Sequence, residues 1–393
     1  MNCESLRGLL DESTIRRLNE VAHDLAQSDD FHDPIAWRKA IPSLAAIDLP
    51  HHLGGTPLSV VQMMSIFRTF GRLSLDLRDV PGLGHGRMLN LPACGDRFSS
   101  TLLNVASGES FIAICITEES SGTDLRALKT TATRTLNGYE LSGEKCFVAR
   151  LQQADAFIVF ARVAEKQETQ DKLTAFLIDA QTPGLSIRDI PSLGLNGISW
   201  GALRLDRVFV PCARRIGAER RGSVLFSEHF SYWRCAMAAA ATGAAESALD
   251  KAKERLHSRT VFAAPIGRFS HLQQQYAIHA ARLHMAWLLI VDAAARIDSN
   301  EDCYVDSAMA KAETVEICID AVQWSMHIHG AYGYSLTAGL EKPLRDLLGL
   351  RIADGTTDVL RSQVARGLLG EDLYTQQIGR STTRTPTSER RLW

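Results

Sequence analysis

Two short turns gather side chains that could take part in chemistry. Ser120-Ser121-Gly122-Thr123-Asp124 follows an apolar run, and Asp354-Gly355-Thr356 lies much later in the chain. Both are common turn or helix-cap sequences, because Asp, Ser and Thr side chains bond to nearby backbone N–H groups. A carboxylate such as that of Asp354 can also act as a general base when a dry pocket raises its pKa. The residues alone leave both interpretations open.

Cysteines and histidines form no recognisable set of ligands. The eight cysteines are scattered without a Cys-x-x-Cys pair, which favours a reduced, cytoplasmic chain over a disulfide framework or a zinc site. The spacing of His279, His284, His327 and His329 makes no metal cluster, and we expect structural roles for them. We therefore predict no metal and a cytoplasmic location.

Charge and hydropathy narrow the range of partners. Lys and Arg total 43 against 45 Asp and Glu, a formal net charge of -2, which gives no reason to expect nucleic acid or a membrane as a partner. Residues 1–10 include Glu4 and no long apolar run, so a secretory signal is not expected. The richest apolar stretch, around residues 285–295, is interrupted by Asp292.

The spacing of apolar residues predicts the elements that position these turns. Residues 6–25 and 57–75 have the three- and four-residue spacing of helices. Short runs from residue 111 to 211 are rich in β-forming residues, and Asn137-Gly138 is typical of a hairpin turn. Four helical stretches with short connections then predict a bundle. They are Tyr232–Leu256, Ser270–Asp298, Asp306–His329 and Leu340–Leu369.

These 393 residues, of which 45% are hydrophobic, are enough for more than one domain. We predict a helical domain over residues 1–110, a β-domain over 111–222 and a helical bundle over 223–372. Residues 373–393 are rich in Ser, Thr and Arg, and we expect a disordered tail there.

Five motifs occur in order between about residues 6 and 369. They are CITEESSGTD (115–124), GEKCFVA (143–149), a turn with Arg259, Phe262, Pro265 and Ile266, HIHGAYGY (327–334), and Arg345-Asp346 with IADGT (352–356). They resemble the flavin loop CxTExxxGSD, the strand G-x-K-x-W-I-T, the turn R-x-x-F-G-x-P-I, the loop Q-x-x-G-G-x-G and the closing R-D and Y-E-G-T elements of the acyl-CoA dehydrogenase superfamily. Each motif alone is weak, whereas five in the right order are specific.

The resemblance implies an α+β fold with an N-terminal helical domain, a middle β-barrel or sheet domain and a C-terminal four-helix bundle. It implies an FAD-dependent oxidoreductase that removes an α-proton and a β-hydride from an acyl thioester. Residues 152–155 and 202–211 also resemble dehydrogenases of polyketide pathways, which act on acyl groups held by acyl carrier proteins, as in the making of hydroxylated malonyl extender units. The acyl group is therefore carried as a thioester by CoA or by a carrier protein. The resemblance does not specify the electron acceptor. We expect a homodimer or homotetramer.

By this resemblance, Asp354 stands where the family usually has a glutamate base. Aspartate is shorter by one methylene, about 1.5 Å of reach, so the substrate sits closer, its α-proton is more acidic, or the reaction differs. The backbone N–H at this position helps to bind the thioester oxygen in the family. Some relatives carry the base on the helix of Arg234, but the corresponding residue here is Trp233, and Glu228 lies more than a turn away.

The resemblance also implies the remaining site residues. The predicted cofactor-binding residues are Ile116, Thr117, Gly122, Thr123, Phe147, Val148, Ala149, Arg259, Phe262, His327, Gly330, Ala331, Thr356 and Asp358. The predicted substrate-binding residues are Thr123, Arg234, Gly355 and Arg361. Arg259 and Phe262 would reach the FAD of a neighbouring subunit, where the fork of an arginine suits a pyrophosphate.

Several positions depart from the family pattern and keep alternatives open. Ala149 replaces a threonine that donates to the flavin, His327 replaces a glutamine, and Asp358 is an acid where an amide is usual. A remodelled member of the fold with non-redox thioester chemistry, or with no dehydrogenase activity, is the main alternative. A flavin monooxygenase on this fold ranks last, because those relatives generally lack the element seen here as Asp354-Gly355-Thr356.

Overall fold

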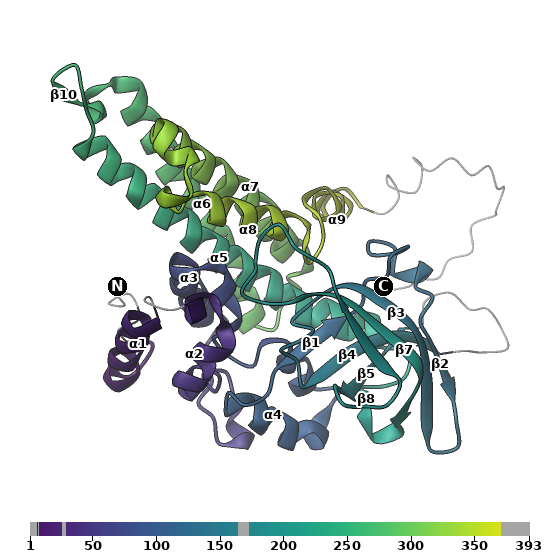
Figure 1. Ribbon diagram of the computed structural model, residues 1–393. Helices are drawn as coiled ribbons and strands as arrows, with labels where there is room; N and C mark the ends of the chain where they lie inside the picture. The colour runs from purple at the N-terminus through teal and green to yellow at the C-terminus, as the bar shows by residue number, and fades with distance from the viewer. Residues whose placement is uncertain (1–5, 7, 26–28, 164–172, 371–393) are drawn as a thin grey trace, which may run out of the picture.

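The computed structural model describes residues 6, 8–25, 29–163 and 173–370. Helices at the start of the chain lie beside a β-sheet, and a long helical bundle extends away from both (Figure 1). The described α-helices are α1 (Glu12–Leu25), α2 (Pro34–Ala40), α3 (Val60–Leu73), α4 (Ser99–Ala106), α5 (Gly222–Ser258), α6 (Ser270–Asp298), α7 (Tyr304–Ile328), α8 (Glu341–Ile352) and α9 (Thr357–Leu369). The predicted tail over residues 373–393 lies outside the described residues.

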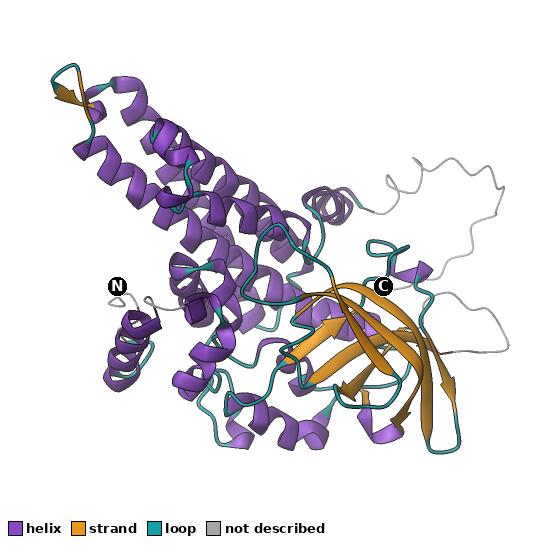
Figure 2. Ribbon diagram, in the orientation of Figure 1, coloured by secondary structure: helices purple, strands orange, loops and turns teal. Residues whose placement is uncertain are grey.

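The strands form one main sheet and a small hairpin at the far tip of the bundle (Figure 2). They are β1 (Ile112–Cys115), β2 (Thr131–Arg134), β3 (Gly138–Ala149), β4 (Ala156–Val163), β5 (Leu173–Asp179), β6 (Leu185–Asp189), β7 (Trp200–Pro211), β8 (Arg215–Ile216), β9 (Thr260–Val261) and β10 (Ala264–Pro265). The order in the main sheet is β6-β7-β3-β2-β4-β5-β8, with β1 paired in parallel to β4. The predicted hairpin is confirmed, since β2 and β3 pair antiparallel. Its turn differs from the expected one, because Gly138 is already the first residue of β3, its oxygen accepts from the N–H of Thr135 at 2.9 Å, and neither Asn137 nor Gly138 has a positive φ.

Helix α5 is the axis of the bundle. Its alanine-rich segment from Ala236 to Ala245 is buried all round, as expected of a helix packed between others. Helix α3 approaches it closely at two glycines. A Cβ on Gly71 would lie 2.0 Å from the carbonyl oxygen of Ala240, and one on Gly243 would lie 1.9 Å from that of Arg68. The N-terminal helices therefore share one core with the bundle.

The predicted α+β class with its helical, strand-rich and helical regions is confirmed, and the domain boundaries stay a prediction. One predicted element was wrong. Residues 340–369 do not form one helix, because Asp354 (φ 58°) and Gly355 (φ 103°) have left-handed backbone conformations that end α8 before α9 begins. Of the described helices, α6 alone has the length and composition of a membrane span, and here it packs against the bundle core.

Candidate active site

The turn between α8 and α9 presents Asp354. Gly355 is required there, because a Cβ at its φ of 103° would be strained and would lie 2.8 Å from Leu360 Cδ2. Thr356 caps α9, and its hydroxyl accepts a hydrogen bond of 3.3 Å from the backbone N–H of Val359. The cap interpretation of this sequence is therefore correct for Thr356, which leaves the carboxylate of Asp354 available for another role.

Two buried cations hold this turn in place. Arg234 Nε on α5 donates to the backbone oxygen of Asp354 at 3.3 Å, and Lys311 Nζ on α7 donates to that of Gly355 at 2.7 Å. Both side chains are almost completely buried. Lys311 was not among the predicted site residues, since a lysine in an apolar helical stretch carries no sign of its partner in sequence.

The electrostatics of the turn reflect two opposing effects. Burial raises the pKa of the half-buried Asp354 carboxyl, while the positive charges of Lys311, Arg150 and Arg234 act to lower it. Burial lowers the pKa of Lys311 to about 8, against the attraction of Asp354. A carboxylate with a raised pKa, fixed at a strained turn, has the properties required of a general base.

A buried ion pair holds the predicted flavin loop, residues 115–124, against β3. Lys145 Nζ on β3 lies 2.8 Å from Glu118 Oε1, and it also donates to the backbone oxygen of Ile116 at 3.1 Å. Burial acts to raise the pKa of Glu118, but hydrogen bonds from Lys145 and Thr130 lower this pKa below its ordinary value. The backbone N–H of Cys146 donates to the oxygen of Thr117 at 2.8 Å. These contacts leave Gly122 and Thr123 exposed at the tip of the loop.

An aromatic pair lies at the end of β3. Phe147 has a φ of 60° where the β3–β7 register shifts, and its ring is stacked on Trp200 with a centroid distance of 5.2 Å. Phe147 is 47% exposed, which is unusual for an aromatic ring on a sheet. Val148 is buried and Ala149 pairs with Trp200. Trp200 was not predicted, because it lies about fifty residues away from Phe147 in sequence.

These features fit the flavin that the motifs imply. The exposed face of the Phe147 ring provides a stacking surface for a flat ring system. The half-buried Thr117 and the exposed Gly122 and Thr123 lie on the neighbouring loop and could supply hydrogen bonds. Ala149 has no hydroxyl to donate, so any bond from this position must come from the backbone.

A second group of predicted residues lies at the far tip of the bundle (Figure 1). Arg259 ends α5, and Phe262 lies in the β9–β10 turn with 91% of its side chain exposed. The exposed Gly330 and Ala331 follow α7, next to His329, whose backbone oxygen accepts a hydrogen bond of 3.4 Å from Arg255 Nη2. His327, on the last turn of α7, is also exposed. Within one chain this group lies far from β3 and the Asp354 turn, so it could reach such a site only in another copy.

Two predicted residues lie at exposed positions of α9. Arg361 forms a two-pronged ion pair with Glu313 of α7, at 2.7 and 2.9 Å, and is exposed. Asp358 is exposed on the first turn of α9, where a negative charge suits the helix N-terminus. The predicted contacts of Arg361 with substrate and of Asp358 with cofactor stay predictions.

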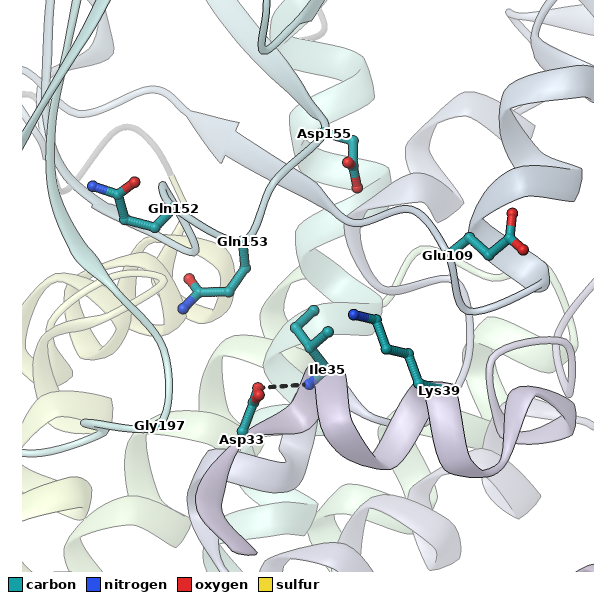
Figure 3. Close-up of a pocket in the computed structure, with 8 residues that line it drawn as sticks. All are labelled: Asp33, Ile35, Lys39, Glu109, Gln152, Gln153, Asp155 and Gly197. Atoms are coloured by element: carbon teal, nitrogen blue, oxygen red, sulfur yellow. Dashed lines mark hydrogen bonds between the residues drawn. The ribbon is translucent and has the colours of Figure 1, made fainter. Parts of the chain in front are cut away.

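A surface hollow of about 360 Å³ lies between α2 and the connection from β3 to β4 (Figure 3). It is lined by Asp33, Ile35, Lys39, Glu109, Gln152, Gln153, Asp155 and Gly197. Several of these groups are already bonded within the protein, as when Gln153 Oε1 accepts from the hydroxyl of Ser199 at 2.7 Å. None of the residues predicted to do chemistry lines it, and we do not assign the active site to it. No group of three or more potential metal ligands occurs in the part of the chain that the structure describes.

Comparison with known proteins places these features in a family. Residues 113–208 match the acyl-CoA dehydrogenase middle domain, and residues 220–369 match the acyl-CoA dehydrogenase C-terminal domain. The chain is 28% identical to 3-(aryl)acrylate reductase of Clostridium sporogenes, over 93% of this chain and 98% of that protein. It is 30% identical to the probable acyl-CoA dehydrogenase YngJ of Bacillus subtilis, over 68% and 71% of the two chains. The crystal structure of the prolyl acyl carrier protein oxidase AnaB has a TM-score of 0.82 at 25% identity, and the match covers 91% of this chain and 99% of that one.

Proposed function

The chain belongs to the acyl-CoA dehydrogenase family, and from this premise we propose that it oxidises an acyl thioester between the α and β carbons with FAD as its cofactor. The observation that carries the proposal is the Asp354 turn. Its carboxyl has a raised pKa, and two buried cations bind the backbone oxygens of Asp354 and of Gly355. A base for a weakly acidic α-proton needs both properties.

In the proposed mechanism, the carboxylate of Asp354 accepts the α-proton of the substrate. The backbone N–H of Asp354 donates to the thioester oxygen, where negative charge develops as the proton leaves. Arg234 and Lys311 keep the turn from shifting during this transfer, which matters because a 1 Å displacement can slow a reaction by roughly 10²-fold. FAD, when bound, supplies the acceptor for the β-hydride. Phe147, Thr117 and the loop up to Thr123 would hold its ring system.

The carrier of the acyl group is either CoA or an acyl carrier protein. The solved structure of a prolyl acyl carrier protein oxidase supports the carrier-protein alternative by likeness. We further propose a cytoplasmic homodimer or homotetramer in which Arg259 and the Gly330 loop of one subunit complete the cofactor site of another. The separation of these residues from β3 within one chain supports this assembly. A protein with this fold but without redox chemistry remains the second candidate, favoured by Ala149 and Asp358.

Purification tests the proposed function directly. We expect about one FAD per chain to copurify, and an acyl thioester to bleach the visible flavin absorbance under anaerobic conditions. Asp354→Asn should keep the flavin but reduce the bleaching rate by about 10²–10⁴-fold, since an amide cannot accept the proton. Asp354→Glu should show whether the pocket is shaped for the shorter acid. Colourless protein that does not take up FAD, or an Asp354→Asn variant as fast as wild type, would favour the non-redox alternative.

A further inference from the structure

A buried arginine joins the end of the proposed flavin strand to the helix beside the proposed base. Arg150 directly follows Ala149, has a φ of 68° and is 4% exposed. Its guanidinium forms an ion pair with Asp79 and lies 5.4 Å from the ring centroid of Trp233 on α5. Trp233 in turn precedes Arg234, which holds the backbone oxygen of Asp354. Arg150 and Trp233 therefore form a wall between β3 and the Asp354 turn.

A pair of buried histidines extends this wall. His85 Nδ1 lies 2.8 Å from His229 Nε2, and both rings pack against Trp233. Burial lowers the pKa of His229 to about 3, so the pair is neutral. The other ring nitrogen of His229, Nδ1, is buried and has no hydrogen-bond partner among the described residues. Such an unsatisfied buried group needs an explanation, and a bound ligand is one.

Buried positive charges near Asp354 and Arg150 outnumber the carboxylates that act on them. The cations that act on Asp354 are Lys311, Arg150, Arg234 and Arg78. The carboxylates that act on these four cations are Asp354 itself, Glu316, which acts on Lys311, and Asp79, which pairs with both Arg78 and Arg150. Arg234 Nη1 is also buried without a hydrogen-bond partner in the described part of the chain. A buried excess of positive charge is unfavourable unless an anion compensates it.

We propose that the acyl group carries a carboxylate at its far end, which is bound by Arg150 and the free Nη1 of Arg234, with the His85–His229 pair closing the pocket behind it. This inference deepens the proposed function and rests on it. A plain hydrocarbon tail would leave Arg234 Nη1 and His229 Nδ1 without partners. A carboxylate offers the acceptor oxygens that guanidinium groups prefer, and it can also accept from His229 in the tautomer that carries its proton on Nδ1. The substrate class is therefore a short dicarboxylic acyl thioester.

The first test compares acyl groups on the wild-type holoenzyme. Succinyl and glutaryl groups, their uncharged half-amides, and butyryl and pentanoyl groups are each presented on CoA and on a phosphopantetheinyl carrier protein. Anaerobic flavin bleaching gives the rate, and calorimetry with Asp354→Asn holoenzyme gives the affinity without turnover. We expect the carboxylates to be favoured over the half-amides by roughly 10- to 100-fold, the range of a charge-assisted hydrogen bond.

The second test changes the arginine. Arg150→Gln should abolish the preference for carboxylates, so that carboxylates and their half-amides react at the same rate as each other, and Arg150→Lys should keep part of the preference. Arg188→Gln is the matched control, because Arg188 is exposed on β6 and pairs with the exposed Glu144 at 3.6 Å. Half-amides or hydrocarbons that bind and react as well as carboxylates would overturn the carboxylate site alone. If no thioester bleaches the flavin, the proposed function fails, and calorimetry still decides whether the wall binds an anion. If Arg150→Gln does not fold, the comparison on the wild-type enzyme decides.

Discussion

At the scale of single residues, Lys311 is the group whose titration the structure most clearly connects to the Asp354 turn. It is buried, its pKa lies at about 8, and it donates to the carbonyl next to Asp354. It is therefore protonated at neutral pH and loses its proton within the range in which enzymes are usually assayed. When it does, the bond to Gly355 loses its charge assistance and Asp354 loses a nearby cation.

This titration predicts the pH dependence of kcat/KM. On the acid side, activity should rise as Asp354 ionises, and on the alkaline side it should fall above about pH 8 as Lys311 is deprotonated. In Lys311→Met the cation that lowers the pKa of Asp354 is absent, so the acid limb should move to higher pH and the alkaline limb near pH 8 should disappear. The pH profile of kcat/KM for both proteins measures this.

Lys251→Met is the matched control for Lys311→Met. Lys251 also donates to two backbone oxygens, those of Ala338 and Gly339, both at 3.1 Å. These carbonyls lie near the far tip of the bundle and not at the Asp354 turn. The control should keep both limbs of the profile, and an unchanged profile in Lys311→Met would show that Lys311 does not affect Asp354.

At the scale of elements, β3 and the loop after β1 act as one unit through Lys145 and Glu118. The Lys145 and Glu118 side chains are 0% and 6% exposed. Each charge is buried, and each is compensated by the other, so removing one leaves the other unpaired. Lys145→Met should reduce the free energy of unfolding by roughly 3 kcal/mol, at the low end for a broken buried pair because Lys129 and Thr130 still donate to Glu118. The variant should also bind FAD more weakly, since the backbone of Ile116, next to Thr117, loses its bond to Lys145. Denaturant unfolding and flavin fluorescence measure the two effects.

Two controls separate the buried pair from a general effect on the strand. The double variant with Lys145→Met and Glu118→Gln has no unpaired charge and should be destabilised less than Lys145→Met alone. Glu144, the neighbour of Lys145 on β3, forms an exposed pair with Arg188 at 3.6 Å, and Arg188→Met should change stability little. Equal losses in the buried and exposed variants would contradict the role assigned to the pair.

At the scale of the whole molecule, the bundle separates two groups of predicted site residues. Asp354 and Phe147 lie at the end near the sheet, whereas Arg259, Phe262 and the Gly330 loop lie at the other end (Figure 1). If one subunit completes the site of another, two inactive variants should restore activity when they are mixed. In a dimer of one Asp354→Asn chain and one Arg259→Ala chain, one composite site carries both changes and the other carries none.

The mixing experiment has a clear readout. The two variants are unfolded together, refolded with FAD and assayed, and random pairing should return about a quarter of the wild-type activity when the assembly is a dimer. Each variant refolded alone is the control. A mixture no more active than its parts would mean that Asp354 and Arg259 serve the same chain's site, or none. Sedimentation of the wild-type protein as an FAD-bound monomer at micromolar concentration would exclude a shared site altogether.

The sequence alone determined the features that depend on neighbours along the chain. The order of helices, strands and helices followed from the spacing of apolar residues. The hairpin between β2 and β3 followed from the two alternating runs on either side of Asn137-Gly138, although neither residue has a positive φ. The five motifs were sufficient to indicate the family, because their order constrains the fold more than any one of them. The domain boundaries and the assignment of site residues stay predictions that the experiments above test.

Only the tertiary structure decided which distant side chains meet. Lys311, Trp200 and Arg150 gave no sign in sequence of their contacts with Gly355, Phe147 and Trp233. It also divided the expected last helix at Asp354 and separated Arg259 from the flavin loop by the length of the bundle. The physical reason is that hydrophobic periodicity specifies which face of an element is buried, whereas its partner is selected by close packing between elements far apart in the chain.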